Sequence, residues 1–348
     1  MTETRTTTEA PAATPAWLDE VPVRRLLEDG LETRFPLPPG DRPLVEPGAA
    51  VLPGDPLLEH IRDRRIHDVE VHAGDAGRPM PGSRWAPAPG RRRRDRELEG
   101  ELLAPVPGKN DRWRLVTGDH RVVLPSPVAG LVTEVRPGAE ICVRPHGRAL
   151  RAAFAAGSAA RGRLELATDP FGELRPGGID VGRAGSILVV GSRIDAEALT
   201  RARAMGVRGI VVATLPGKEL RDFQASERRQ RAALHAIPPF GVLVLEGAIR
   251  RPIPGPVTAL LERFAGQEVA LLVDPPALVF EGEDPAPTEI DRAWVRIRSG
   301  PNAGAEGRLL GPAGLRRFAA GVQLEAAFVE LEGEPPLAVP LGDLERYA

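Results

Sequence analysis

Four short runs of apolar residues constrain the fold of this chain more than any other feature of its sequence. They lie at residues 186–190 (SILVV), 209–213 (GIVVA), 241–245 (GVLVL) and 269–273 (VALLV). Each run is too short for a buried helix, and none shows the polar alternation of a strand that has one face in water. Strands that are apolar on both faces are typical of a parallel sheet covered by helices. The runs therefore predict four buried, parallel strands.

Helical periodicity fills the gaps between these runs. After the first run, apolar residues recur at helical spacing, at Ile194, Ala198, Leu199, Ala202 and Met205. Ser192 is followed three residues later by Asp195, which resembles a capping box. Further helices are expected at residues 219–235 and 256–265. Because parallel neighbours need a crossover, residues 163–274 are predicted to form a small α/β parallel-sheet domain with right-handed crossovers.

The α/β segment resembles the swivelling β/β/α type of domain. The resemblance rests on ALTRARAMGVRGIVVATL, IPPFGVLVLEG and ALLERFAGQEVALLV. If it held, His235 would be a candidate phosphoryl carrier, but a histidine at a helix end more commonly makes a capping contact. Ser192 is a candidate anion-binding residue at a helix start, although one glycine before a capped helix is more often a tight turn. Glycine-rich nucleotide motifs and the G-x-S-x-G elbow are absent, so no catalytic residue is predicted.

Length and composition set the broader frame. A chain of 348 residues exceeds the usual single domain, so an α+β multi-domain protein is expected. Residues 1–15 are rich in Thr, Ala and Pro and read as a disordered leader. A short helix is expected at residues 17–29. The formal charge of −2 gives no global attraction to nucleic acid or to an anionic membrane.

The sequence predicts a cytoplasmic location and no bound metal. No apolar run approaches the length of a membrane span, and the N-terminus lacks the pattern of a secretory signal. The single cysteine, Cys142, excludes an intrachain disulfide and reads as a small core residue. His60, His67 and His72 lie among acidic residues, which makes a metal site conceivable, but without a paired-histidine motif they are expected to be surface histidines on a strand.

Two turn-rich segments before the α/β region share the same sequence pattern, which is typical of short β-strands. Residues 42–61 (RPLVEPGAAVLPGDPLLEHI) and 122–143 (VVLPSPVAGLVTEVRPGAEICV) contain short apolar runs separated by Pro-Gly turns. They resemble the hairpins of a split biotinyl/lipoyl-like barrel-sandwich hybrid. Carriers of that family hold the cofactor on a lysine, and neither segment contains one, so no cofactor is expected. The two segments are predicted to pack into one β-rich module over residues 16–150.

An insertion at residues 63–120 interrupts this module. It contains Arg91, Arg92, Arg93 and Arg94 in succession, followed by acidic residues. Such a block is usually a solvated loop. The alternative is that the four arginines bind an anion such as a phosphate.

The strongest local signal is WVRIRSGPNAGAEGRLL at residues 294–310. Apolar and cationic residues alternate there before a Gly-rich turn, and a strand then restarts. The segment resembles the KOW motif of NusG-type elongation factors and several ribosomal proteins. Residues 327–331 and 337–344 fit the later strands of that family. The resemblance implies a KOW-like, SH3-like β-barrel over residues 289–348.

Charge is unevenly distributed in this barrel. Residues 292–317 hold six arginines against Glu306, whereas residues 318–348 hold five glutamates and Asp343 against Arg346. The arginines expected to bind a macromolecule are Arg296, Arg298, Arg308, Arg316 and Arg317. The first three are predicted to share one exposed face. The expected partner is a protein; RNA or a ribonucleoprotein, and a barrel that only docks on the rest of the chain, are the alternatives.

The function predicted from the sequence is therefore that of a non-catalytic cytoplasmic adaptor acting through the C-terminal barrel. The competing class is an accessory subunit or enzyme with a small-molecule site between the β-rich module and the α/β domain.

Overall fold

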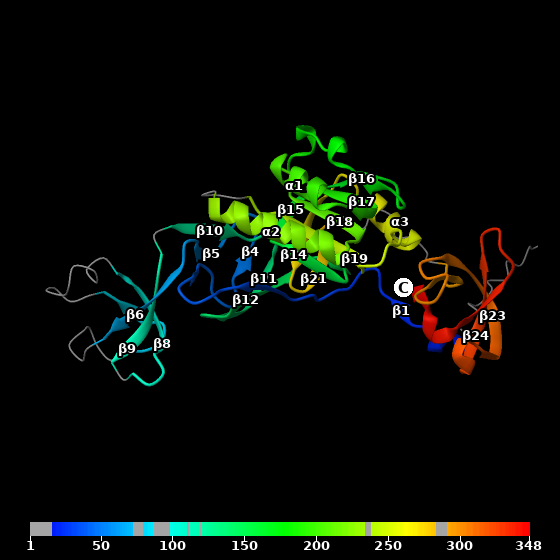
Figure 1. Ribbon diagram of the computed structural model, residues 1–348, viewed down its shortest axis with the longest axis horizontal. Helices are drawn as coiled ribbons and strands as arrows, with labels where there is room; N and C mark the ends of the chain where they lie inside the picture. The colour runs from blue at the N-terminus through cyan, green and yellow to red at the C-terminus, as the bar shows by residue number, and fades with distance from the viewer. Residues whose placement is uncertain are drawn as a thin grey trace, which may run out of the picture.

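The computed structural model is mostly β, with three α-helices in the part of the chain that it describes. The described residues are 16–71, 79–86, 98–109, 111–118, 120–233, 238–282 and 291–348. The molecule is elongated, with a small sheet at one end, a large sheet with helices in the middle and the C-terminal sheet at the other end (Figure 1). The fold is thus a multi-sheet assembly built around one mixed sheet.

Nine strands form the central sheet. Eight of them follow the order β13-β21-β20-β15-β17-β18-β19-β14, and β16 pairs with β17 outside this path. Their bounds are β13 (Arg148–Arg151), β14 (Phe154–Gly157), β15 (Ala160–Leu166), β16 (Glu173–Leu174), β17 (Ser186–Ile194), β18 (Gly209–Thr214), β19 (Gly241–Gly247), β20 (Glu268–Val273) and β21 (Pro276–Phe280). The helices are α1 (Ala196–Ala204), α2 (Gly217–Ala233) and α3 (Gly255–Arg263), and short 3-10 turns lie at η2 (Pro176–Gly178) and η3 (Val181–Arg183).

The parallel strands predicted from the first three apolar runs are confirmed. β17, β18 and β19 are parallel neighbours, with α1 and α2 in the crossovers. Successive residues of β17 enter different cores: Ile187 packs in a core with residues of α3, and Leu188 packs in one with residues of α1 and α2. Helices therefore cover both faces, which explains the loss of polar alternation.

The fourth apolar run corrects the prediction of an all-parallel sheet. β20 is antiparallel to both β15 and β21. Its side chains are nevertheless buried on both faces, because Val269 and Leu271 pack in the core with α3 while Ala270 and Leu272 pack in the core of the β-rich module. The apolar run correctly predicted that both faces of β20 are buried. It did not fix the direction of the strand, because strands of the β-rich module can bury a face as well as helices can.

The start of α1 also differs from the expectation. Asp195 is the N-cap, and its side chain accepts a hydrogen bond from the backbone N–H of Ala198 at 2.7 Å. Ser192 lies within β17 instead of at the helix start, and its side chain is buried. The capping partner is therefore the residue immediately before the helix.

The two turn-rich segments pair with each other, as their shared strand chemistry predicted. β10 (Arg121–Pro125) pairs with β5 (Pro56–Ile61), and β11 (Gly130–Arg136) pairs with β4 (Ala50–Val51). The remaining strands are β2 (Thr33–Pro36), β3 (Arg42–Pro43) and β12 (Glu140–Pro145). Their common core includes Val51, Leu58 and Val132 and continues into β20 and β21. The two segments therefore form one β-rich module, made of the sheets β10-β5-β3 and β2-β12-β11-β4, which packs against one face of β20 and β21.

The insertion contains a sheet with its own core. β6 (Arg65–Glu70), β9 (Arg112–Thr117), β8 (Gly100–Pro105) and β7 (Arg84–Trp85) lie side by side in that order. We call this the insertion sheet; it stands apart from the central sheet in Figure 1. Its buried residues are Val69, Val71, Trp85, Leu102, Trp113 and Leu115. The insertion is thus a small folded unit and not only a loop.

The prediction of an N-terminal helix at residues 17–29 is wrong. A 3-10 turn, η1 (Ala16–Glu20), is followed by the strand β1 (Val23–Arg24), which pairs in parallel with the last strand of the chain. Pro22 explains part of the difference, because a proline has no backbone N–H for a helix interior. The apolar residues divide between two cores: Leu18 and Val21 join the C-terminal core, and Leu26 joins the central one.

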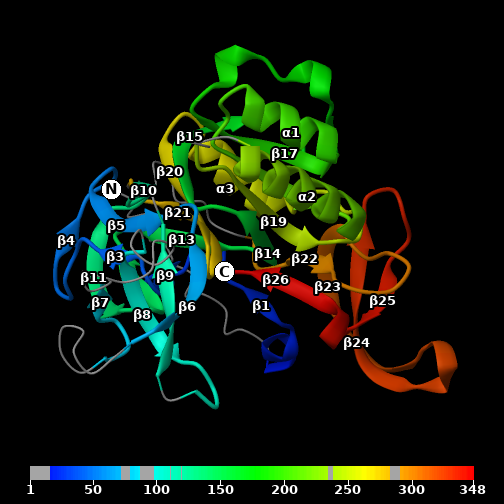
Figure 2. The same ribbon diagram turned by 60° about the vertical axis from the view of Figure 1, so that its left-hand side comes forward.

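The C-terminal sheet has six strands in the order β1-β26-β22-β23-β24-β25. Their bounds are β22 (Trp294–Ile297), β23 (Glu306–Arg317), β24 (Gln323–Leu331), β25 (Leu337–Pro340) and β26 (Leu344–Tyr347), with 3-10 turns η4 (Ala319–Gly321) and η5 (Leu341–Asp343). Val295, Ile297, Val329 and Leu344 are central to its core. β1 ties this sheet to the N-terminal segment, and Figure 2 shows the two lying side by side.

In the described part of the chain, no helix has both the length and the apolar character needed to cross a membrane.

Candidate functional site

Arg296 lies at the junction of the C-terminal and central sheets. Val295 and Ile297 point into the C-terminal core, so Arg296 must point to the opposite face of β22. The central sheet covers that face: the Arg296 side chain is 2% exposed, and its Nη2 donates to the carbonyl oxygen of Pro252 at 3.1 Å. The prediction that Arg296 belongs to an exposed binding patch is therefore wrong.

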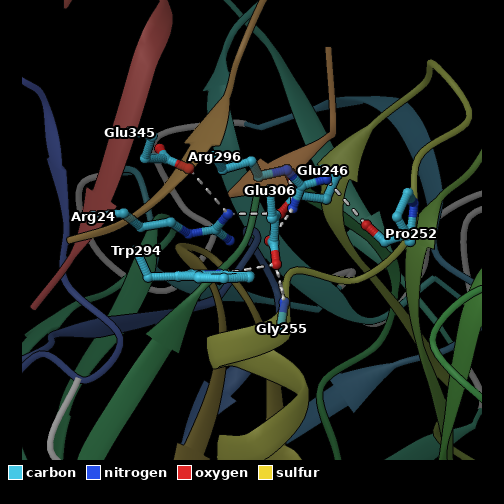
Figure 3. A network of polar contacts seen from close by, with 8 residues as sticks. All are labelled: Arg24, Glu246, Pro252, Gly255, Trp294, Arg296, Glu306 and Glu345. Atoms are coloured by element: carbon cyan, nitrogen blue, oxygen red, sulfur yellow. Dashed lines mark hydrogen bonds and ion pairs between the residues drawn. The ribbon is translucent and has the colours of Figure 1, made fainter. Parts of the chain in front are cut away.

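Two carboxylates accompany this buried guanidinium (Figure 3). The Nη1 atom of Arg296 lies 3.4 Å from Glu246, which is on β19, and 3.9 Å from Glu306, which is on β23. Glu246 also accepts a hydrogen bond from Arg24 of β1 at 2.6 Å. Burial lowers the pKa of Arg24, but the charge and hydrogen bond of Glu246 outweigh burial and raise it overall. The network therefore connects three separate parts of the chain.

Glu306 faces the beginning of α3. Its two carboxylate oxygens accept from the backbone N–H of Gly255 at 3.1 and 3.0 Å, and Trp294 Nε1 donates to it at 3.3 Å. Burial raises the pKa of Glu306, while the Gly255 N–H and the charge of Arg296 oppose this rise. A carboxylate at this point complements the positive end of the helix dipole. Glu306 thus caps a helix of the central layer from the C-terminal sheet.

A cleft opens beside this network. Its volume is about 400 Å³, and its charged lining consists of Arg24, Glu246, Arg251, Arg296, Arg298 and Glu345. A second cavity of about 620 Å³ shares Arg24, Leu245, Arg298 and Glu345 with the first. The sequence did not indicate this site, because its residues come from β1, the end of β19, the segment before α3, and the C-terminal sheet. No local sequence motif can therefore indicate this site.

The other predicted arginines are exposed but scattered. Arg298 follows the end of β22 and lines the cleft, while Arg308 is paired across the strands with Trp294. Arg316 and Arg317 lie near the tip of the β23–β24 hairpin, where the guanidinium of Arg316 lies 5.5 Å from the ring centre of Phe328. Cross-strand partners share a face, so the register places Arg308 on the same side of the sheet as Trp294 and Arg296. Arg296 is buried there, so the three arginines do not form the expected exposed face.

Of the predicted anion-binding residues, the structure describes only Ser192. The hydroxyl of Ser192 donates to the carbonyl oxygens of Phe171 and Gly172, at 2.8 and 3.2 Å, so it serves the fold. Arg91, Arg92, Arg93 and Arg94 lie outside the described residues, as does His235.

The histidines considered for a metal site have other partners. His60 Nδ1 lies 2.7 Å from Asp41 Oδ2, and His67 Nε2 lies 3.1 Å from the hydroxyl of Thr117. His72 lies outside the described residues. Within the described ranges, no group of three or more His, Cys, Asp or Glu side chains is arranged to hold a metal ion.

Asp41 is a buried carboxylate at the base of the insertion. Besides His60, it accepts from the backbone N–H of Ile61 at 2.8 Å and from the Arg64 guanidinium at 2.5 Å. Burial alone would raise the pKa of Asp41, but the His60 hydrogen bond, the Ile61 N–H and the charges of His60 and Arg64 lower it below its usual value. The ionised form therefore stabilises the folded state.

We expect the substitution Asp41→Asn to lower the free energy of unfolding at pH 7 by about 2 kcal/mol, because charged hydrogen bonds are lost from a buried group. A carboxyl with a lowered folded pKa contributes stability above its unfolded pKa and loses it as pH falls through the folded pKa. The difference in the free energy of unfolding between wild type and D41N should therefore become smaller below about pH 4. Thermal unfolding from pH 3 to 7 measures this, with the exposed Asp68→Asn as the control. A gap that stays constant over this range contradicts the assignment.

Comparison with known proteins adds no relative. No protein-family model matches this chain, and no curated protein matches it either.

Proposed function

We propose that this protein is a non-catalytic adaptor that binds a protein partner through the β23–β24 hairpin of its C-terminal sheet. The proposal includes the finer fold: a KOW-type, SH3-like barrel at residues 289–348, a barrel-sandwich hybrid in the β-rich module and a swivelling type of central domain. The strand order of the C-terminal sheet and the Gly-rich turn after β22 support the KOW-type barrel. The pairing of β10 with β5 supports the barrel-sandwich hybrid.

The observation that carries the proposal is the exposed tip of the hairpin. β25 pairs with β24 only as far as Ala326, and β22 pairs with β23 only at residues 306–308. The hairpin therefore continues beyond its neighbours as two strands, and it projects from the sheet in Figure 2. Both of its faces are open to a partner.

The tip carries apolar and cationic side chains together. Its exposed apolar residues are Leu315, Val322 and Leu324, with 58%, 50% and 41% of their surface accessible. Arg316 pairs across the strands with Leu324, and Leu315 pairs with Glu325. Leu324 therefore shares one face of the hairpin with Arg316, and Leu315 lies on the other face with Glu325. An isolated two-stranded hairpin is marginal in water, and exposed apolar residues on both of its faces favour a protein partner that encloses the tip. A protein with an apolar groove and an acidic rim fits this surface.

The same residues argue against nucleic acid as the main partner. Glu325 and Glu330 lie on β24 opposite Leu315 and Arg308, so acidic groups alternate with the arginines. Nucleic-acid surfaces concentrate positive charge along the phosphate path. Leucines contribute apolar contact area to protein interfaces and read neither phosphates nor base edges.

We expect the double substitution Leu315→Asp and Leu324→Asp to reduce recovery of the co-purified partner at least 10-fold, because it places charge in the apolar contact on each face of the hairpin. The tagged full-length protein is isolated from its native cells with and without nuclease and at high salt. Val181→Asp is the matched control, because Val181 is 73% exposed but lies in the central layer.

Nuclease should leave the partner bound, and both variants should keep the melting temperature of the wild type. Loss of the partner on nuclease treatment would support the nucleic-acid alternative. Equal recovery by the hairpin variant and by V181D would contradict binding through the hairpin.

A further inference from the structure

We infer that the arginine-lined cleft between the central and C-terminal sheets binds a phosphate group, either as free phosphate or on a small phosphate monoester. This site is separate from the hairpin tip. It combines a cavity, an excess of positive charge and a buried donor that lacks an acceptor.

The charge of the cleft favours a dianion. Its lining includes four guanidinium groups, those of Arg24, Arg251, Arg296 and Arg298, against the two carboxylates of Glu246 and Glu345. An excess of two positive charges matches a phosphate dianion.

Within the described residues, only two of the four arginines that line the cleft form ion pairs with carboxylates. Glu246 pairs with both Arg24 and Arg296, and Glu345 lies 3.9 Å from Arg24. Arg251 and Arg298 have no carboxylate partner among the residues that the structure describes. These two guanidinium groups are therefore free to bind a ligand.

Glu306, 3.9 Å from Arg296, reduces this excess only in part. Its carboxylate is outside the lining of the cleft and accepts two contacts from the N–H of Gly255 at the start of α3. Its nearest guanidinium contact, to Arg296, is 3.9 Å long. The positive end of the helix dipole, equivalent to about half a charge, offsets part of the charge of Glu306.

One buried nitrogen donor of the lining lacks an acceptor. Arg251 Nε is buried and makes no hydrogen bond within the described part of the structure, whereas Arg296 Nη1 has only its ion pairs with Glu246 and Glu306. A buried donor without an acceptor costs about 1–3 kcal/mol, so each such group requires an explanation. Phosphate carries several acceptor oxygens and forms bidentate contacts with guanidinium groups. A bound phosphate would give acceptors at once to Arg251, in the segment before α3, and to Arg298, in the C-terminal part of the chain.

The position of the cleft in the fold supports a ligand site. Leu245 and Glu246 lie near the carboxyl end of β19, the last of three parallel neighbours. Ligands of open α/β sheets bind outside the carboxyl ends of their parallel strands. The volume of about 400 Å³ exceeds that of a phosphate ion and leaves room for a small organic substituent. The second cavity, which shares Arg24 and Arg298, extends this space.

Calorimetric titration of the full-length protein tests the inference. The probes are inorganic phosphate and phenyl phosphate, each in chloride buffer at constant ionic strength. We expect saturable binding at one site. Arg251→Gln and Arg298→Gln should each weaken it at least 10-fold, whereas Arg308→Gln, an exposed arginine of the same sheet outside the cleft lining, should leave it unchanged.

The outcomes separate the two sources of the phosphate group. Tighter binding of phenyl phosphate than of phosphate supports a monoester, and the reverse supports the free ion. The melting temperature of each variant without ligand confirms its fold. Absence of binding at tens of millimolar of both probes overturns the inference, as does equal binding by wild type, R251Q and R298Q.

Discussion

Replacing Arg296 with methionine is expected to lower the free energy of unfolding by about 3 kcal/mol, because removal of one partner leaves buried charges uncompensated. Methionine keeps much of the length of the side chain and removes only its charge and donors. Glu246 retains Arg24 at 2.6 Å and Glu306 retains the Gly255 N–H, so the effect lies at the lower end of the range for broken buried pairs. Urea-induced unfolding followed by tryptophan fluorescence measures it.

Arg308→Met is the matched control for this change. Arg308 is an exposed arginine on the adjacent strand, opposite Trp294, and exposed substitutions usually change stability by no more than about 0.5 kcal/mol. Similar unfolding curves for the two variants would show that Arg296 does not hold the two sheets together.

The role of Arg296 shows why one face of the C-terminal sheet could not be assigned from its sequence. Alternation along residues 294–298 correctly separates the core side, which holds Val295 and Ile297, from the other side. It cannot say whether that other side meets water or a neighbouring sheet. Arg296 contacts Pro252 and Glu246, which lie far from it in the sequence, and only the tertiary fold brings them together.

The central layer was predictable because its signals are local. The apolar runs, helical spacing and glycine stops each act within one element, and β17, β18, β19 and the three helices appear where these patterns place them. The direction of β20 depends on the β-rich module that covers it, and this information is outside the strand. The N-terminal segment is a similar case, because β26, from the other end of the chain, pairs with β1.

The cleft illustrates the same limit for function. Each of its arginines is unremarkable in its own segment, and the sequence contains no glycine-rich phosphate motif. Its chemistry arises from the meeting of β1, β19 and the C-terminal sheet, where four guanidinium groups converge. By contrast, Arg316 and Arg317, which the sequence indicated as binding residues, are exposed because they lie near the tip of the β23–β24 hairpin.

Trp113→Ala is expected to unfold the insertion sheet while leaving the rest of the protein folded. Trp113 is 9% exposed and packs with Val69, Trp85 and Leu102 in a core confined to this sheet. Truncating a buried tryptophan to alanine costs about 3–5 kcal/mol. A sheet this small has little stability to lose, so the substitution should raise the population of its open form to a majority.

Hydrogen exchange resolved by segment measures this effect. Amides of β6, β8 and β9 should exchange far faster in the variant, whereas those of β17, β18 and β19 should keep their protection, because local units open separately when they do not share a core. Ile66→Ala in the same sheet is the control, since Ile66 is 59% exposed and its loss leaves no cavity. Faster exchange that spreads into β5 and β10 would show that the insertion and the β-rich module unfold as one unit. Unchanged exchange in β6 and β9 would show that Trp113 does not stabilise the insertion sheet.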